Sequence, residues 1–428
     1  PYVDSKGNFG KAYSKNMAYA ASRYTEAKLD KLAAELFRDI DKDTVDFVPN
    51  YDNSMTEPTL FPVTFPSILV NNNMGIAVGM ASNICSFNLK ELCDTTIALM
   101  KDKNADITET LLAPDFPGGG AIIYDRESMK QIYETGSGSV KIRSRYNYDK
   151  EQNCIDIIQI PYSTTIEAIL KRITELVKEG KLKEVTDFRD EIDLNGFKLT
   201  LDLRRNTDPD RLMAKLYKLT PLEENFNCNF NILIANSPRV MGVKEIISEW
   251  VAFRNECVKR RVYFNLQKAK ERLHLLKGLA KILLDIDKAI KIVRETDEEK
   301  EVVPNLMIGF GIDETQAEYV AEIKLRHLNR QYILKRLEDV ENLEKQVEEL
   351  QSVLDSRRKQ LGIIIKELEA VAAKYGQPRK TAIIETEAEE DIKEEVVADT
   401  APVTIFFTKD GYFKKITPQS LRMSGEQK

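Results

Sequence analysis

Two heptad repeats in the C-terminal half of the chain constrain its fold more than any other feature. In the first, apolar residues recur at alternating spacings of four and three: Val262, Leu266, Ala269, Leu273, Leu276, Ala280 and Leu283. The second keeps one register through Val340, Leu343, Val347, Leu350, Leu354, Leu361, Ile364, Leu368, Val371 and Tyr375. Two such helices most simply form an antiparallel coiled coil. We expect it over residues 239–293 and 331–378.

The other segments predict further domains. Residues 294–330 read as a small helical knob, in which Asp313 and Gln316 have the spacing of a capping box. Residues 67–238 mix strand-like and helix-like patterns and predict an α+β domain. Residues 379–400 form an acidic linker, and 401–428 contain a hairpin that begins a further β domain. The chain is therefore expected to be an α+β multidomain protein.

Composition narrows the class of protein. No apolar run approaches the roughly 18 residues that a membrane helix needs, so we expect no membrane partner. The five cysteines lack metal-ligand spacing and are typical of reduced thiols in a cytoplasm. His274 and His327 are the only histidines, which disfavours a histidine-based metal site or triad. The net charge of −6 argues weakly against a nucleic-acid partner, although residues 1–25 are locally basic.

Three glycine-rich stretches invite a nucleotide-binding interpretation. "GSGSVK" at 136–141 lacks the spacing of a phosphate-binding loop, and "PGGGAII" at 117–123 precedes a strand instead of a helix. "GFGI" at 309–312 is too short to indicate anything. We interpret all three as turns and expect this chain to bind neither ATP nor a metal ion by itself.

Arg23 and Tyr24 precede a segment in which apolar residues from Leu29 to Ile40 recur at helical spacing, so a helix is predicted there. A tyrosine before a helix is usually structural. Here, however, a "GNFG" turn at 7–10 and the basic residues Lys11 and Lys15 lie nearby. A phenol has a pKa near 10 and needs an adjacent cation or base to act as a nucleophile. A guanidinium matches phosphoryl geometry, which makes a phosphate a fitting electrophile.

These residues carry a resemblance to a known family. The motifs "GNFG", "ASRYTEAKL", "DFVPNYDNSMTEPTLFP", "GIAVGMASNI", "PDFPGGG" and "TGSGSVKIRSR" occur in this order, followed by "IPY" and the heptads. Together they resemble the A subunit of bacterial type IIA DNA topoisomerases, DNA gyrase and topoisomerase IV, over residues 1–378. The resemblance implies a partial winged-helix DNA gate at 1–66, a tower at 67–238 and an exit-gate knob at 294–330.

The resemblance also implies a reaction. Tyr24 would attack a DNA phosphodiester to leave a 5′-phosphotyrosyl bond, and Arg23 would stabilise the transition state. Double-stranded DNA would be the substrate of a homodimer joined to two B subunits, which hold the Mg²⁺ and the ATP. The protein would be cytoplasmic and nucleoid-associated.

Further site residues follow from matching positions. Ile76 matches the family's wedge, which kinks DNA between base steps; without the resemblance it reads as a core isoleucine. Arg143 and Arg145 match basic tower positions, and strand alternation puts both on one face. Lys11 and Lys15 complete the expected DNA-binding set.

The knob is expected to join two copies of the chain. Its helix from Asp313 has an apolar face with few partners, and this face predicts the dimer interface: Ala317, Val320, Ala321 and Leu328. The alternative is that this face folds back onto Val302–Ile308.

Two rival functions remain at this point, a structural DNA-bridging coiled-coil protein and a catalytically silent DNA clamp. The choice between gyrase and topoisomerase IV also stays open.

Overall fold

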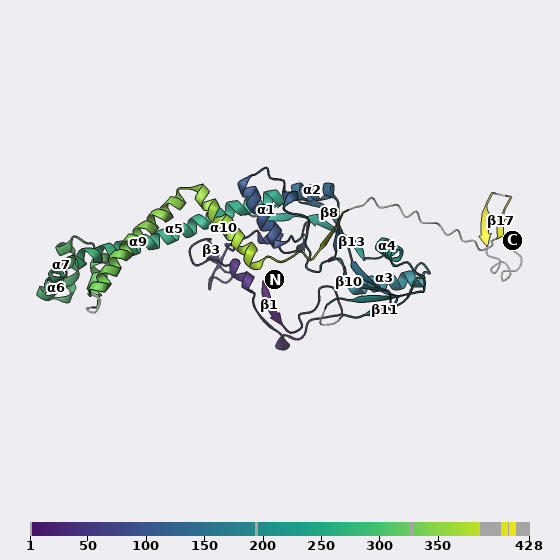
Figure 1. Ribbon diagram of the computed structural model, residues 1–428, viewed down its shortest axis with the longest axis horizontal. Helices are drawn as coiled ribbons and strands as arrows, with labels where there is room; N and C mark the ends of the chain where they lie inside the picture. Colours follow the sequence, from purple (N-terminus) through teal and green to yellow (C-terminus); the bar gives the residue numbers. More distant parts are fainter. Residues whose placement is uncertain (1, 193–195, 325–328, 386–403, 410, 417–428) are drawn as a thin grey trace. The chain divides into compact units, whose positions relative to one another are not determined.

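The computed structural model describes residues 2–192, 196–324, 329–385, 404–409 and 411–416 (Figure 1). The chain divides into two units, residues 1–385 and 386–428. In the second, β17 (Thr404–Phe407) pairs antiparallel with β18 (Phe413–Ile416). In the first, helices and several sheets occur together, which confirms the predicted α+β class.

A six-stranded sheet forms the centre of the first unit. Its strands in spatial order are β16 (Ala382–Glu385), β7 (Ala121–Tyr124), β8 (Ser137–Arg143), β13 (Glu223–Asn229), β6 (Met80–Ile84) and β5 (Asn73–Ala77). The main apolar core includes residues of this sheet, of α1 (Leu89–Lys101) and of α2 (Arg126–Thr135). The same core includes the short turn η4 (Ile107–Glu109).

The sheet corrects one predicted boundary. β16 pairs in parallel with β7, and both Lys380 N and Thr381 N donate to the carboxylate of Asp115. Arg379 also donates to both carboxylate oxygens of Glu91. Residues 382–385 are therefore a strand of the sheet and 379–381 are bonded beside it, so the predicted linker at 379–400 begins too early. The many acidic residues of the predicted linker obscured this four-residue strand, which is rich in apolar side chains.

A four-stranded antiparallel sheet carries a second core. Its strands in order are β11 (Val185–Asp190), β12 (Leu199–Leu203), β10 (Cys154–Gln159) and β9 (Arg145–Asp149). The helices α3 (Ile166–Lys178) and α4 (Pro209–Leu219) bury their apolar faces in the same core. Asp208 caps α4, and the proline that follows is suited to a first helical position because its missing N–H is not needed there.

Three long helices follow the sheets, and α9 lies along α5 in Figure 1. They are α5 (Val243–Leu283), α9 (Arg330–Leu354) and α10 (Arg357–Tyr375). Arg254 near the start of α5 pairs with Glu367 on α10, whereas Lys277 near its end pairs with Glu344 on α9. As the residue number increases along α5, the residue number of the ion-pair partner decreases, from Glu367 to Glu344. The helices α9 and α10 therefore run antiparallel to α5.

Three shorter helices pack at the end of α5. They are α6 (Ile286–Glu295), α7 (Glu299–Phe310) and α8 (Glu314–Ala321). The predicted capping box is confirmed: the Asp313 carboxylate accepts from the backbone N–H of Gln316, and the Gln316 side chain accepts from the backbone N–H of Asp313. Leu306 of α7 is fully buried among these helices.

The N-terminal segment contains short strands and turns. They are β1 (Val3–Lys6), η1 (Ser22–Tyr24), β2 (Glu26–Leu29), η2 (Lys31–Glu35), β3 (Phe47–Pro49), β4 (Thr56–Pro58) and η3 (Ser67–Leu69). The helix predicted over Leu29–Ile40 is present only as the short 3₁₀ helix η2. Leu29 pairs with Val3 in a β-ladder, and Asp39 has a left-handed backbone that a longer right-handed helix does not allow.

Candidate functional site

Tyr24 lies at the end of η1 with its side chain 67% exposed. The guanidinium carbon of Arg23 lies 4.8 Å from the centroid of the Tyr24 ring. A cation at this distance is attracted to the electron-rich face of an aromatic ring. The structure therefore brings together the phenol and the cation that the sequence placed side by side.

The backbone around Tyr24 is fixed by a close approach to Gly7. Gly7 has φ +91°, and a Cβ at this position would lie 2.5 Å from the carbonyl oxygen of Tyr24. The ladder between β1 and β2 holds the two segments together on either side of η1. Asn8 adds a bond from its Nδ2 to the carbonyl of Ala18 at 3.2 Å. The "GNFG" turn thus supports the backbone of Tyr24 directly.

Lys11 and Lys15 are exposed on the segment 11–17, which we call the basic loop. Glu167 of α3 anchors this loop, because it accepts from the hydroxyl of Ser14 and from the backbone N–H of Asn16 at 3.1 Å. Burial raises the pKa of Glu167, but these hydrogen bonds outweigh it and lower the pKa to about 2. The anchor is therefore a carboxylate at neutral pH.

Ile76 lies on β5, at the edge of the six-stranded sheet, and is 85% exposed. Met74 and Val78 on the same hairpin are also exposed. The interpretation of Ile76 as a core residue is therefore wrong. Apolar side chains on an exposed hairpin are suited to a contact with another molecule.

Arg143 and Arg145 do not share one strand face as predicted. Arg143 ends β8 in one sheet and Arg145 begins β9 in the other, because the chain crosses between the sheets at the buried Ser144. Arg143 pairs with Glu223, and its guanidinium lies 5.1 Å from the ring centroid of Tyr217. Arg145 is exposed.

The predicted dimer face of α8 is mostly internal. Ala317 is fully buried against α7, and Val320 packs in the same cluster. Ala317 cannot meet a second copy, and the alternative packing against α7 is the one observed. Ala321 is exposed, and Leu328 lies outside the described residues.

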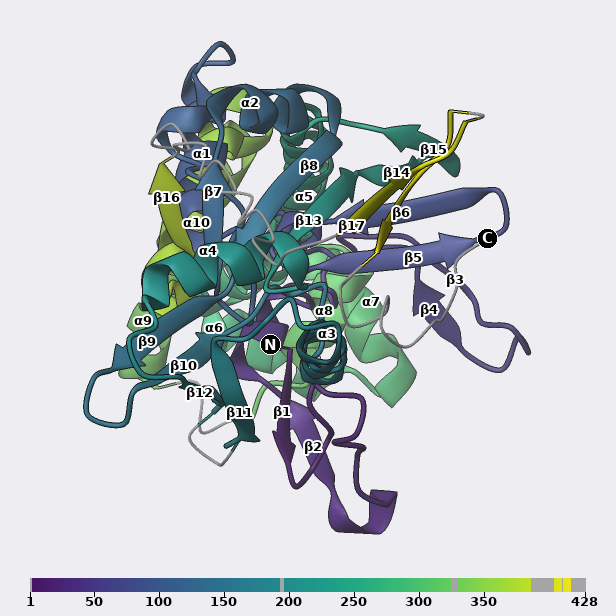
Figure 2. The same cartoon turned by 90° about the vertical axis from the view of Figure 1, so that its right-hand side faces the viewer.

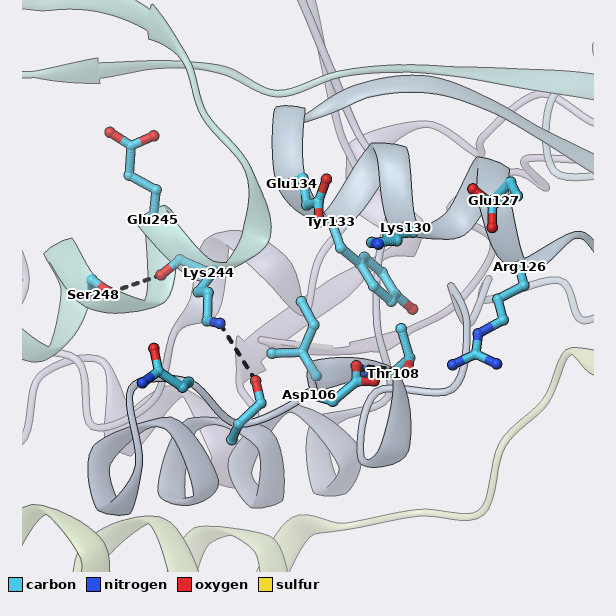
Figure 3. A pocket seen from close by; sticks show the side chains of 13 residues that line it. Asp106, Thr108, Arg126, Glu127, Lys130, Tyr133, Glu134, Lys244, Glu245 and Ser248 are labelled. Atoms are coloured by element: carbon cyan, nitrogen blue, oxygen red, sulfur yellow. Dashed lines mark hydrogen bonds between the residues drawn. The ribbon is translucent and has the colours of Figure 1, made fainter.

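A cleft of about 830 Å³ lies away from Tyr24 and Ile76 (Figure 3). Segments near η4, α2 and the start of α5 line it, and Lys244 Nζ donates to the carbonyl of Ala105 there at 3.4 Å. Charged side chains of both signs line the cleft: Asp106, Arg126, Glu127, Lys130, Glu134, Lys244 and Glu245. Sequence reasoning missed it, because three distant segments form it and none carries a motif.

Three further properties concern the described residues. They include no group of three or more His, Cys, Asp or Glu side chains that could hold a metal ion. Within them, no helix is both long and apolar enough to cross a membrane. All five cysteines are unpaired and buried.

Comparisons with known proteins show which family the chain belongs to. Residues 1–369 match the family model that describes the A subunit of DNA gyrase and topoisomerase IV. The gyrase A protein of Clostridium acetobutylicum is 38% identical over 97% of this chain and 50% of that protein. The corresponding A protein of DNA topoisomerase 4 from Escherichia coli is 37% identical over 97% of this chain and 55% of its own length.

The gyrase A protein of Borreliella burgdorferi is 34% identical over 99% of this chain and 53% of that protein. The chain thus spans about half the length of the relatives it matches. The match runs through the segment that holds Arg23 and Tyr24 together. The chain therefore belongs to the family of DNA gyrase and topoisomerase IV A subunits.

Proposed function

We propose that this chain is the breakage–reunion part of a type IIA topoisomerase, with Tyr24 as its nucleophile. The observation that carries the proposal is the exposed phenol of Tyr24 under the guanidinium of Arg23, in a chain of this family. The phenolic oxygen attacks the phosphorus and loses its proton, while the bond from phosphorus to the 3′ oxygen breaks. The 3′ oxygen takes up a proton. Reversal reseals the strand without ATP, because the covalent link keeps the bond energy.

Arg23 would stabilise the charge that develops on the phosphate. Its guanidinium carbon lies 4.8 Å from the centroid of the Tyr24 ring, and a bidentate guanidinium matches two phosphate oxygens. The exposed Lys11, Lys15 and Arg145 would hold the DNA backbone, whereas Arg143 has its charge paired with Glu223. Ile76 would enter between two base pairs and bend the duplex.

The proposed complex contains double-stranded DNA, a homodimer of this chain and two B subunits. The B subunits would hold the Mg²⁺ and the ATP, and the assembly would act in the cytoplasm on nucleoid DNA. Relatives named as gyrase and as topoisomerase IV have similar identities to this chain, so we assign the shared reaction and not one of the two enzymes.

The proposal gives names to parts of the fold. Residues 1–66 would belong to a winged-helix DNA gate, and 67–238 to the tower. The antiparallel pairing of α5 with α9 and α10 supports a coiled coil, whose distal helices α6–α8 would form the exit gate. A structural DNA bridge or a silent clamp would share this architecture, and only the chemistry of Tyr24 separates them from an enzyme.

The test substitutes Tyr24→Phe in the full-length protein, reconstituted with its B subunit, Mg²⁺ and supercoiled DNA. We expect no covalent protein–DNA adduct on a denaturing gel and DNA affinity close to that of the wild type, because phosphate contacts dominate binding. Tyr19→Phe is the matched control, since Tyr19 is a second exposed tyrosine in the same segment. An adduct formed by the Tyr24→Phe protein would contradict the assignment, and a wild type without any adduct would favour the clamp.

A further inference from the structure

The hairpin that carries Ile76 has little backbone support from the sheet. β6 pairs with β13 at one position only, Asn83 opposite Asn229, and β5 is the edge strand. Beyond that pair the hairpin has its own cross-strand register, in which Ile76 lies opposite Ala81. A two-stranded ribbon is marginally stable by itself in water. Its direction therefore depends on other contacts.

Side-chain amides provide those contacts. Asn229 Nδ2 donates to the carbonyl oxygen of Ala81 at 2.9 Å, and Asn231 Nδ2 donates to the same oxygen at 3.3 Å. A carbonyl oxygen has two lone pairs and can accept both bonds. We call Asn229 and Asn231 the asparagine clamp. It joins the end of β13 and the start of β14 (Asn231–Ile234) to the hairpin, and Figure 2 shows these strands beside β6.

The register explains why this carbonyl is available. Ala77 and Met80 form the pair next to the turn. In an antiparallel ladder, hydrogen-bonded and non-hydrogen-bonded pairs alternate, and a two-residue turn is closed by a bonded pair. The next pair, Ile76 with Ala81, is therefore non-bonded, and the Ala81 carbonyl points away from β5. A bond to that oxygen fixes the backbone directly opposite Ile76.

Apolar side chains do not fill the space between the hairpin and β14. A hollow of about 270 Å³ separates the hairpin from β14, with Ile76 and Met80 on one side and Ile232 and Leu233 on the other. Leu233 is itself 64% exposed. At the base of the hairpin, Asn83 Nδ2 also donates to the carbonyl oxygen of Asn227 at 2.6 Å. Nearer the turn, where side chains do not fill the hollow, the two bonds of the asparagine clamp hold the hairpin at Ala81.

We propose that Asn229 and Asn231 are positioning residues that set the direction in which Ile76 enters DNA. The inference rests on the proposed function, in which Ile76 bends the duplex. Separating two stacked base pairs costs a few kcal/mol, and DNA pushes back on the wedge with an equal force. A hairpin held at Ala81 transmits that force to the sheet, whereas a released hairpin tilts and bends the DNA less.

The experiment uses the full-length protein in complex with its B subunit. A duplex labelled with two fluorophores reports bending by energy transfer. The clamp variant carries Asn229→Asp and Asn231→Asp, which keep the size of each side chain but remove its N–H donors. The matched control carries Asn225→Asp and Asn227→Asp, because both residues are exposed on the face of β13 that carries Asn229 and together add the same two negative charges.

We expect the clamp variant to bend the duplex less and to cleave it about tenfold more slowly, the effect of losing one to two hydrogen bonds. Cleavage of a duplex nicked at the bend should recover, since flexible DNA needs less force. In an Ile76→Ala background the clamp substitutions should add nothing, which a merely structural role would not predict.

Three outcomes separate the hypotheses. Bending and cleavage equal to those of the control with Asn225→Asp and Asn227→Asp would overturn the asparagine-clamp proposal while leaving the proposed function intact. A further loss of bending in the Ile76→Ala background would also overturn it, because the clamp would then act through other residues. A wild-type protein that forms no covalent adduct would instead overturn the proposed function itself.

Discussion

At the scale of single residues, the site depends on Gly7 as much as on Arg23. The backbone of Gly7 passes so close to the Tyr24 carbonyl that no side chain fits between them. Its positive φ also suits glycine over any other residue. The Tyr24 phenol is therefore placed by a contact between two backbones, and this contact gives a direct test of the proposed role of Tyr24.

Gly7→Ala should move Tyr24 and slow DNA cleavage about 100-fold, since a displacement of about 1 Å at a reacting group has this effect. Gly180→Ala is the matched control. Gly180 also has positive φ, at +72°, but a Cβ there would meet nothing within 4 Å. Backbone strain should cost each variant about 1 kcal/mol of stability, and the collision with the Tyr24 carbonyl should add to this loss in Gly7→Ala alone, as measured by urea unfolding. Equal cleavage rates for the two variants would show that the contact at Tyr24 does not matter.

At the scale of elements, one face of α8 packs against neighbouring helices and another face is exposed to solvent. Val320 packs against the core of the neighbouring helices, while the adjacent Ala321 is exposed. The two residues differ by one position and therefore point in different directions. Among the predicted dimer residues that the structure describes, Ala317 is buried and leaves the set, whereas the half-buried Val320 and the exposed Ala321 remain predictions.

Val320→Glu should destabilise the helices around α8 by about 2 kcal/mol, because it places a charge against an apolar cluster. Thermal unfolding measures this loss. Ala321→Glu should leave the unfolding temperature unchanged and convert a proposed dimer to monomers in sedimentation velocity. If the Ala321→Glu protein remains a dimer, the partner surface lies on another element.

At the scale of the whole first unit, one buried ionic cluster joins three distant segments. Arg254 is 1% exposed and donates to the carbonyl of Pro62 at 2.8 Å and to Glu367 at 2.7 Å. Arg261 bridges Glu367 at 2.8 Å and Asp39 at 2.7 Å. The cluster therefore fastens the segment that follows Tyr24 to both α5 and α10.

This cluster predicts a pH dependence. Burial raises the pKa of Asp39, but hydrogen bonds from Lys42 and Arg261 outweigh it and leave the pKa below its usual value of 3.8. Because the folded-state pKa is the lower one, ionised Asp39 stabilises the fold above pH 3.8, and this contribution is lost as the pH falls further.

We expect the free energy of unfolding to decrease below about pH 4, and Asp39→Asn to remove part of that decrease. Urea unfolding between pH 3 and pH 7 measures it. Asp43→Asn, at an exposed carboxylate bonded to Arg260, is the control and should keep the wild-type profile. A wild-type profile in the Asp39→Asn protein would exclude Asp39 as a source of the pH dependence.

The sequence by itself determined the features that depend on local spacing. Heptads predicted the long helices, the Asp313 capping box followed from its four residues, and Arg23 lies beside Tyr24 because they are neighbours in the chain. The motifs around that pair also identified the family, which the comparisons confirm.

Only the tertiary structure decided which surfaces are free. Helical spacing places Ala317 on the apolar face of α8, but it does not say whether α7 covers that face. Strand alternation near Arg143 likewise does not reveal that the chain passes from one sheet to the other at Ser144. The same holds for β16, whose partner β7 lies more than 250 residues earlier in the chain. The clamp at Ala81 joins residues 148 and 150 positions apart. Burial and pairing depend on such distant contacts, and sequence periodicity describes only the near ones.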